Sequence, residues 1–131
     1  MKVLDSDLLI GIMKKNSDAF DWFEASKNSR EDLATTALNA QELLYGSLLT
    51  INPSEGYRLT AEFIKSLSIL DLDLESAELS SRLRSELKKK GQSIGIMDEM
   101  IAGICLRNDA SIVTRNTKHF SRVGGLDVEK W

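Results

Sequence analysis

The stretch Lys2-Val3-Leu4-Asp5-Ser6-Asp7-Leu8-Leu9 (residues 2–9) decides how the rest of the sequence is interpreted. Its apolar run stops at Asp5, as a short buried β-strand does. The apolar residues that follow recur at the spacing of one helical face: Leu8, Leu9, Ile12 and Met13. A carboxylate at the end of a buried strand is costly unless it is paired. The stretch therefore predicts a strand, then a helix, with a polar site at the point where they join.

The same alternation of short β runs and longer helical runs continues along the chain. We expect further strands at residues 33–38, 68–72, 111–114 and 126–129, with helical segments in the intervals between them. Strands that are separated by helices pair in parallel through right-handed crossovers. The sequence therefore predicts a three-layer α/β architecture in a single domain, residues 1–131.

Local signals indicate where several helices begin and end. Asn39, with Glu42 three residues later, has the form of an N-cap and its capping-box partner. Asn52-Pro53-Ser54-Glu55 combines a cap, a proline at the first helical position and an acidic residue in the first turn. Gly91 is expected to end a long helix over residues 74–90. Asp98 is expected to open the helix that precedes the fourth strand.

The composition limits the class of protein. The 131 residues are 42% hydrophobic, and 17 basic residues against 20 acidic ones leave a net charge of -3. The single cysteine, Cys105, excludes an internal disulfide and indicates a reducing compartment, the cytoplasm. No apolar run approaches the roughly 18 residues of a membrane span, and Asp5 and Asp7 interrupt the apolar stretch that a signal peptide would need. The mild acidity argues against a basic nucleic-acid-binding surface, although it does not exclude a local one.

Polar residues follow the predicted strands. Asp5 ends the first strand, Glu42 lies early in the helix after the second, Asp98 begins the helix before the fourth, and Asn116 follows the fourth. Ligands of parallel sheets bind beyond the carboxyl ends of the strands, so we expect these four side chains to converge there. Each also has a structural interpretation: Glu42 and Asp98 as helix caps, and Asn116 as a turn residue.

This set of residues favours metal-assisted hydrolysis. Several carboxylates in one pocket repel one another unless a cation neutralises them. Mg²⁺ prefers oxygen ligands and keeps several waters, which hydrolysis of a phosphodiester needs. Nucleophilic chemistry has less support, because His119 is the only histidine, no GxSxG motif is present and Cys105 lies on an apolar helical stripe.

Several motifs of the sequence, taken in order, resemble those of a known family. Residues 3–10 are similar to the opening strand and first acidic residue of PIN-domain ribonucleases, especially the toxins of VapBC toxin–antitoxin pairs. Ala40-Gln41-Glu42-Leu43-Leu44-Tyr45-Gly46 resembles the helix of the second acid, and Asp98-Glu99-Met100-Ile101-Ala102 resembles the third-acid motif. Residues 112–116, His119-Phe120 and residues 125–128 resemble the fourth motif and the closing strand. The resemblance covers essentially the whole chain, in order.

The resemblance implies a Rossmann-like sheet of order 3-2-1-4-5 and RNA cleavage that depends on Mg²⁺ or Mn²⁺. By this resemblance Asp5 and Asp98 bind the metal directly, and Glu42 completes its surroundings or orients a water. Asn116 stands where many members have Asp, which puts a second tightly held metal in doubt. Thr114 and Ser6 are expected to support the acidic cluster through hydrogen bonds.

The resemblance also implies partners. Such toxins form homodimers and are neutralised by a small VapB-like antitoxin, whose tail enters the active-site groove. The helical segments 8–12 and 45–49 are candidate contact surfaces, although most of their side chains are expected to fill the core. Four basic residues are candidates for contacts with the RNA backbone: Lys14, Lys15, Arg115 and Lys118. Lys88–Lys90 compensates a helix dipole or contributes to the same binding.

Three alternatives stay open at the level of sequence. Asp5-Ser6-Asp7 also resembles the opening of haloacid-dehalogenase phosphatases, with Asp5 as nucleophile and Asp7 as acid, although the usual Gly-Thr is missing. A response-regulator receiver would need Asp71 or Asp73 as phosphoacceptor, and its other acidic residues align poorly. Asn116 also permits a catalytically weak PIN domain that binds RNA or a partner without cutting.

Overall fold

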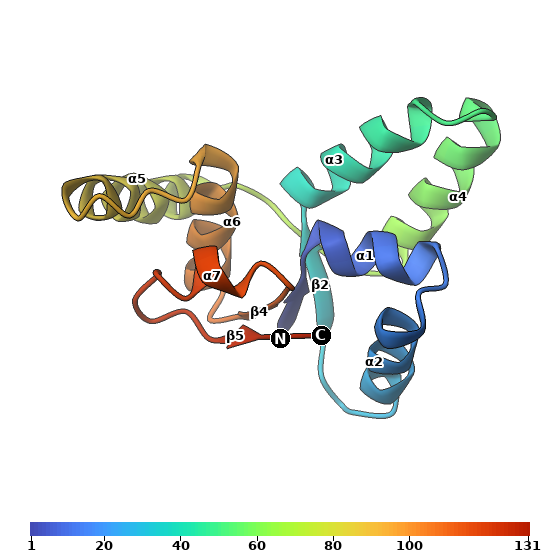
Figure 1. Ribbon diagram of the computed structural model, residues 1–131, viewed down its shortest axis with the longest axis horizontal. Coiled ribbons are helices and arrows are strands. Elements are labelled where there is room, and N and C mark those ends of the chain that lie inside the picture. Colours follow the sequence, from blue (N-terminus) through green and yellow to red (C-terminus); the bar gives the residue numbers. More distant parts are fainter.

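A computed structural model describes all residues, 1–131, and contains one five-stranded sheet (Figure 1). All neighbouring strands pair in parallel, in the order β3-β2-β1-β4-β5, which confirms the expected topology. The strands are short: β1 (Lys2–Leu4), β2 (Leu33–Thr36), β3 (Ser68–Leu70), β4 (Ser111–Val113) and β5 (Val128–Glu129).

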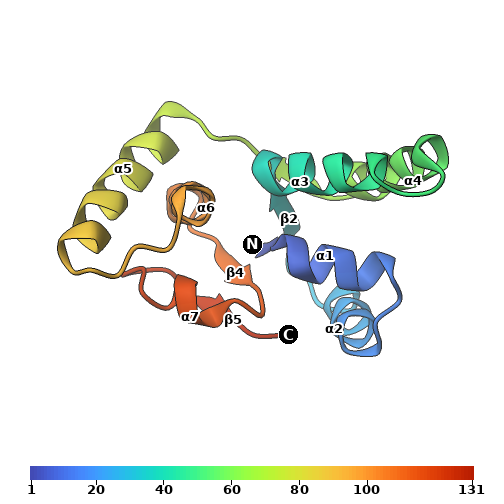
Figure 2. The same ribbon diagram turned by 45° about the horizontal axis from the view of Figure 1, so that its top comes forward.

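Helices cover both faces of this sheet, so the three-layer α/β prediction is confirmed (Figure 2). On one side lie α1 (Ser6–Met13), α2 (Ser17–Lys27), α3 (Ala37–Leu48) and α4 (Pro53–Lys65). On the other side lie α5 (Leu74–Lys89), α6 (Ile96–Arg107) and α7 (Thr117–Phe120). None of these helices has the length and apolar character needed to cross a membrane.

The alternation of side chains along the central strands explains the two layers. Val3 and Ile112 belong to the apolar cluster under α5, α6 and α7. Leu4 and Val113, the next residues along each strand, belong to the cluster under α1 to α4. Successive residues of a strand point to opposite faces, so a short apolar run supplies both cores. Cys105 is buried in the first cluster, and burial raises the pKa of its thiol to about 12, which makes it an inert core residue.

Two helix starts differ from the sequence prediction. The cap of α3 is Thr36, whose hydroxyl accepts a hydrogen bond from the Asn39 amide at 3.1 Å, so Asn39 lies inside the first turn. Glu42 is therefore not a capping-box residue. Helix α6 starts at Ile96, before the predicted Asp98, after Gly95 with φ +97°. A glycine adopts this φ without steric strain, which allows the chain to turn into the helix two residues earlier. Gly91, with φ +64°, follows α5 as predicted.

Candidate active site

The carboxylate of Asp5 is the centre of a hydrogen-bond network at the carboxyl edge of the sheet. Asp5 caps α1, and its Oδ1 accepts hydrogen bonds from the Ser6 amide at 2.8 Å and from Asn39 Nδ2 at 3.0 Å. Its Oδ2 accepts from the Thr114 hydroxyl at 2.7 Å. The starts of α1 and α3 meet here because β1 and β2 run parallel and end side by side (Figure 1). Elements that begin more than 100 residues apart in sequence therefore share one carboxylate.

The surroundings of Asp5 disfavour its charge. Burial raises the pKa of the Asp5 carboxyl to about 6, and the neighbouring negative charges of Asp7 and Asp98 add to the rise. The hydrogen bonds from the Thr114 hydroxyl and the Ser6 amide act in the opposite direction, because they stabilise the carboxylate. The ionised form of Asp5 is therefore under-compensated by this chain alone. A bound cation would stabilise it.

Glu42 joins the network through Ser6. Its Oε2 accepts a hydrogen bond from the Ser6 hydroxyl at 2.7 Å, while Asn39 Nδ2 donates to Ser6 Oγ at 2.9 Å. The Thr36 hydroxyl in turn donates to Asn39 Oδ1 at 2.6 Å, so the buried Asn39 amide is fully engaged. Asn39 is a site residue that the sequence alone does not reveal, because its position before a helical pattern is also typical of a helix cap. Ser6 and Thr114 occupy the supporting positions that were predicted.

Asp98 forms a second part of the site, on the other helical layer. Its Oδ2 accepts a hydrogen bond from Asn116 Nδ2 at 3.2 Å and lies 2.8 Å from His119 Nδ1. Asn116 Nδ2 also lies 3.0 Å from His119 Nδ1, so the carboxylate, the amide and the imidazole form one polar triangle. In the sequence His119 is distinguished only by its place in a motif, so its contact with Asp98 becomes apparent in the structure. Thr114 links this part of the site to Asp5. Its Oγ1 accepts a hydrogen bond from the backbone N–H of Asn116 at 3.0 Å and donates to Asp5 Oδ2 at 2.7 Å.

The four predicted acidic and amide residues thus share one edge of the sheet, connected by hydrogen bonds. No three acidic, imidazole or thiol side chains are grouped as they would be around a single ion. The carboxylate oxygens of the site are nevertheless suitable ligands for a hard cation, and the negative charge of Asp5 is not fully compensated by the chain. Mg²⁺ commonly takes only one or two carboxylates and keeps its waters. The assignment of Asp5, Glu42 and Asp98 as metal ligands stays a prediction.

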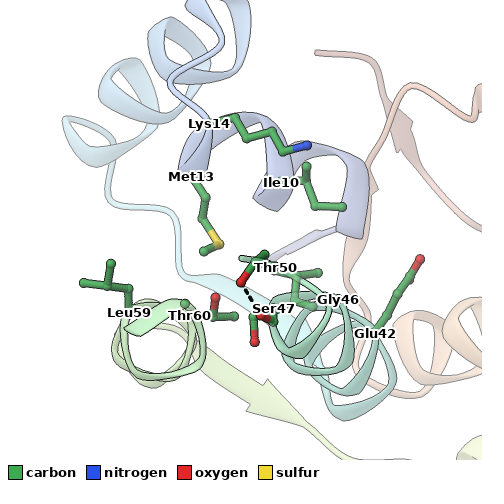
Figure 3. Close-up of a pocket in the computed structure, with 11 residues that line it drawn as sticks. Ile10, Met13, Lys14, Glu42, Gly46, Ser47, Thr50, Leu59 and Thr60 are labelled. Carbon is green, nitrogen blue, oxygen red and sulfur yellow. Dashed lines mark hydrogen bonds between the residues drawn. The ribbon is translucent and has the colours of Figure 1, made fainter. Parts of the chain in front are cut away.

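The basic residues proposed for RNA contact lie in different surroundings. The Arg115 guanidinium is 3.1 Å from Asp18 Oδ2 and stacks on the Trp131 ring at 3.7 Å, so it is already engaged within the chain. Lys15 and Lys118 are exposed, and Lys14 lines a groove between α1, α3 and α4. Figure 3 shows Ile10, Met13 and Leu59 around this groove, with Glu42 at the end away from Met13. The groove therefore leads from an apolar surface to a residue of the acidic network.

Asp7 does not have the surroundings of a phosphatase acid. Its Oδ1 accepts a hydrogen bond from Trp131 Nε1 at 3.0 Å and its Oδ2 accepts from the Arg115 amide at 2.8 Å. Both oxygens are therefore occupied within the chain. The receiver alternative fails on position, because Asp71 and Asp73 follow β3, an edge strand of the sheet, whereas Asp5 follows the central strand β1.

The fold and the site define a class: a parallel α/β domain with one acidic residue directly after β1, one on α3 and one on α6, at the carboxyl edge of its sheet. The family model described as "PIN domain" matches residues 2–126. The chain belongs to the PIN-domain family, with the VapC proteins among its relatives.

Individual relatives match over nearly their whole length. The chain is 30% identical to the tRNA(fMet)-specific endonuclease VapC of Shigella flexneri over 130 residues, which are 98% of this chain and 96% of the relative. A crystal structure of VapBC2 from Rickettsia felis, bound to a DNA fragment from its promoter, is similar with a TM-score of 0.88 and 26% identity; the match covers 99% of this chain and 98% of that one. DNA-bound VapBC from Salmonella typhimurium has a TM-score of 0.86 and 27% identity, covering 99% and 97%.

Proposed function

We propose that this chain is an endoribonuclease that hydrolyses phosphodiester bonds of RNA and acts as the toxin of a toxin–antitoxin pair. The observation that carries the proposal is the Asp5-centred network, which brings Glu42, Asp98 and Asn116 to one edge of the sheet. The similarity to the Shigella flexneri tRNA(fMet)-specific endonuclease supports it and makes initiator tRNA the first substrate to test.

We further propose that Asp5 and Asp98 bind Mg²⁺ or Mn²⁺, with Glu42 beside them. When bound, such a cation screens the charge of the phosphate and lowers the pKa of a water molecule. The chain's own contribution is orientation: Ser6 holds the Glu42 carboxylate, Asn39 and Thr114 hold the two oxygens of Asp5, and Asn116 and His119 hold Asp98. Preorganised polar groups of this kind need little reorganisation during the reaction.

Asn116 fits this arrangement as a donor. Its amide hydrogen-bonds Asp98 at 3.2 Å, which an aspartate at the same position would not do without a proton. Replacing one negative charge by an amide also reduces repulsion around Asp98. We therefore expect an active enzyme, and a PIN domain that binds without cutting is the alternative that the experiment must separate.

The test is cleavage of labelled RNA, including initiator tRNA, by the purified chain in Mn²⁺ or Mg²⁺. Asp98→Asn should reduce the rate by about 100-fold or more, because it removes one carboxylate charge from the site. Asp71→Asn is the matched control: it removes an exposed carboxylate outside the network and should cleave at the wild-type rate. Equal cleavage by wild type and Asp98→Asn would refute the site, and binding of RNA without cleavage by the wild type would favour the non-cutting alternative.

We propose that a VapB-like antitoxin binds in the groove between α1, α3 and α4. Both VapBC structures named above are toxin–antitoxin pairs. The exposed side chains of Tyr45 and Leu48 on α3, and of Leu49 directly after it, favour a homodimer because they are apolar and neighbours in the chain. By contrast, Leu8 and Leu9 are fully buried, so the candidate surface on segment 8–12 reduces mainly to Ile10. A monomer in sedimentation at micromolar concentration would contradict the homodimer.

A further inference from the structure

Trp131 is anchored to the beginning of α1 by a charged acceptor. Its indole Nε1 donates to Asp7 Oδ1 at 3.0 Å, and the Arg115 guanidinium stacks on its ring with Cζ 3.7 Å from the ring centroid. Asp18 fixes the other side of this guanidinium at 3.1 Å. We call Asp7, Arg115 and Trp131 together the Trp131 clasp.

The position of the indole depends on a glycine. Gly11 is buried, and a Cβ at this residue would lie 3.1 Å from Trp131 Cη2 and 2.8 Å from the Ala19 Cβ. Both distances are tighter than ordinary van der Waals contact, so only glycine admits the ring against α1. The ring is therefore held by packing on one side, by the guanidinium on another and by a hydrogen bond at its nitrogen.

Asp7 Oδ2 connects the clasp to the active site: it lies 3.4 Å from the Thr114 hydroxyl, and its shorter contact is with a backbone amide. The Arg115 N–H donates to Asp7 Oδ2 at 2.8 Å. Arg115 separates Thr114, which holds Asp5, from Asn116, which holds Asp98. Fixing the amide of the middle residue fixes the backbone between the two supports. No other side chain accepts a hydrogen bond from the Arg115 N–H, which lies in the loop between β4 and α7.

We propose that Trp131 is a positioning residue of the active site: through Asp7 it holds the Arg115 amide, and with it Thr114 and Asn116, in the geometry that RNA cleavage requires. The proposal rests on the proposed function. It also accounts for Asp7, a carboxylate placed beside Asp5 at the cost of repulsion. Small displacements of supporting residues reduce the rate of a reaction while leaving the substrate-binding surface intact.

The first test compares two tryptophan variants. Trp131→Phe keeps an aromatic ring for packing but removes the donor to Asp7; we expect kcat to fall about tenfold and KM to change less than about twofold. Trp22→Phe is the matched control, because it removes an indole donor to the Glu129 carboxylate at 2.7 Å, which Lys2 continues to hold. We expect Trp22→Phe to keep the wild-type kcat. Equal kcat values for the two variants would overturn the proposal.

The second test does not depend on activity. Amide hydrogen exchange should become faster at residues 114–116 in Trp131→Phe and stay unchanged there in Trp22→Phe. Adding Asp7→Asn to Trp131→Phe should then cause little further change, because both act through the same amide. Unchanged exchange in Trp131→Phe would refute the clasp. If the wild type cuts no RNA while exchange responds as expected, the clasp stands as a structural device and the proposed function fails.

Discussion

At the scale of single residues, Asp5 is held by hydrogen bonds that stabilise its negative charge, in surroundings that disfavour that charge. It receives three hydrogen bonds, yet burial and two neighbouring carboxylates still raise its pKa to about 6. Such a residue is costly for stability, because the three hydrogen bonds do not fully replace the hydration that a buried carboxylate loses. The network around Asp5 therefore indicates function before any relative is considered.

This conflict predicts how stability depends on pH in the absence of metal. The folded-state pKa of about 6 lies above the ordinary 3.8, so the folded protein binds this proton more tightly than the unfolded chain does. The stabilisation from protonated Asp5 is present below pH 4 and is lost as pH rises from about 4 to about 6. The loss corresponds to roughly 3 kcal/mol, from 1.36 kcal/mol per pKa unit.

Asp5→Asn should remove this part of the pH dependence. In EDTA the variant should be more stable than the wild type at pH 7 to 8, and the difference should shrink toward pH 4. Urea unfolding at several pH values measures it, and subtracting the two curves cancels the other titrating groups. A wild-type-minus-variant difference that does not change with pH would show that Asp5 is not the group responsible.

At the scale of elements, helices α5 and α6 pack with their backbones in close contact. A Cβ at Gly103 on α6 would lie 2.6 Å from the carbonyl oxygen of Ser76 and 2.8 Å from the Ser80 Cβ on α5. Helix α6 also carries Asp98, so the helix that this close packing fixes against α5 is the one that bears an acidic residue of the site. The contact between Gly103 and Ser76 therefore supports the helix of Asp98 without itself touching the site.

Gly103→Ala should destabilise the fold by about 2 kcal/mol, because the added methyl forces α5 and α6 apart. Gly46→Ala is the matched control, since no atom lies within 4 Å of a Cβ there and the residue is exposed in α3. Alanine has the higher helix propensity, so Gly46→Ala should stabilise by up to about 1 kcal/mol. Thermal unfolding of both variants decides the matter, and destabilisation of similar size in both would contradict the packing argument.

Local patterns predicted the order and type of the elements, since apolar periodicity and cap signals are local properties. They did not distinguish Thr36 from Asn39 as the cap of α3, because both are good capping residues. The choice depends on Asn39 donating to Asp5 and Ser6, which are 34 and 33 residues away in sequence. The same limit applies to His119, whose partner Asp98 is 21 residues away, and to Trp131, whose partner Asp7 is 124 residues away.

At the scale of the whole molecule, the acidic site accounts for the net charge and joins the two helical layers. The net charge of -3 comes from 20 acidic and 17 basic residues, and Asp5, Glu42 and Asp98 alone account for an excess of this size. An acidic total is therefore compatible with an RNA substrate, provided that a cation neutralises the site. Glu42 belongs to the layer of α3 and Asp98 to the layer of α6, on opposite faces of the sheet.

A divalent cation bound between Asp5 and Asp98 should therefore stabilise the whole fold, because it would relieve repulsion and link α6 to the central strand. At about 100 times its dissociation constant, a ligand of the folded state adds about 2.7 kcal/mol, or about 10 °C in Tm for a domain of this size. The shift with Mn²⁺ should be larger at pH 8 than at pH 5, because protons compete for Asp5. Differential scanning fluorimetry with K⁺ at equal ionic strength as the control measures the effect. Asp98→Asn should abolish most of the shift; an equal shift in the variant would locate the binding elsewhere on the surface.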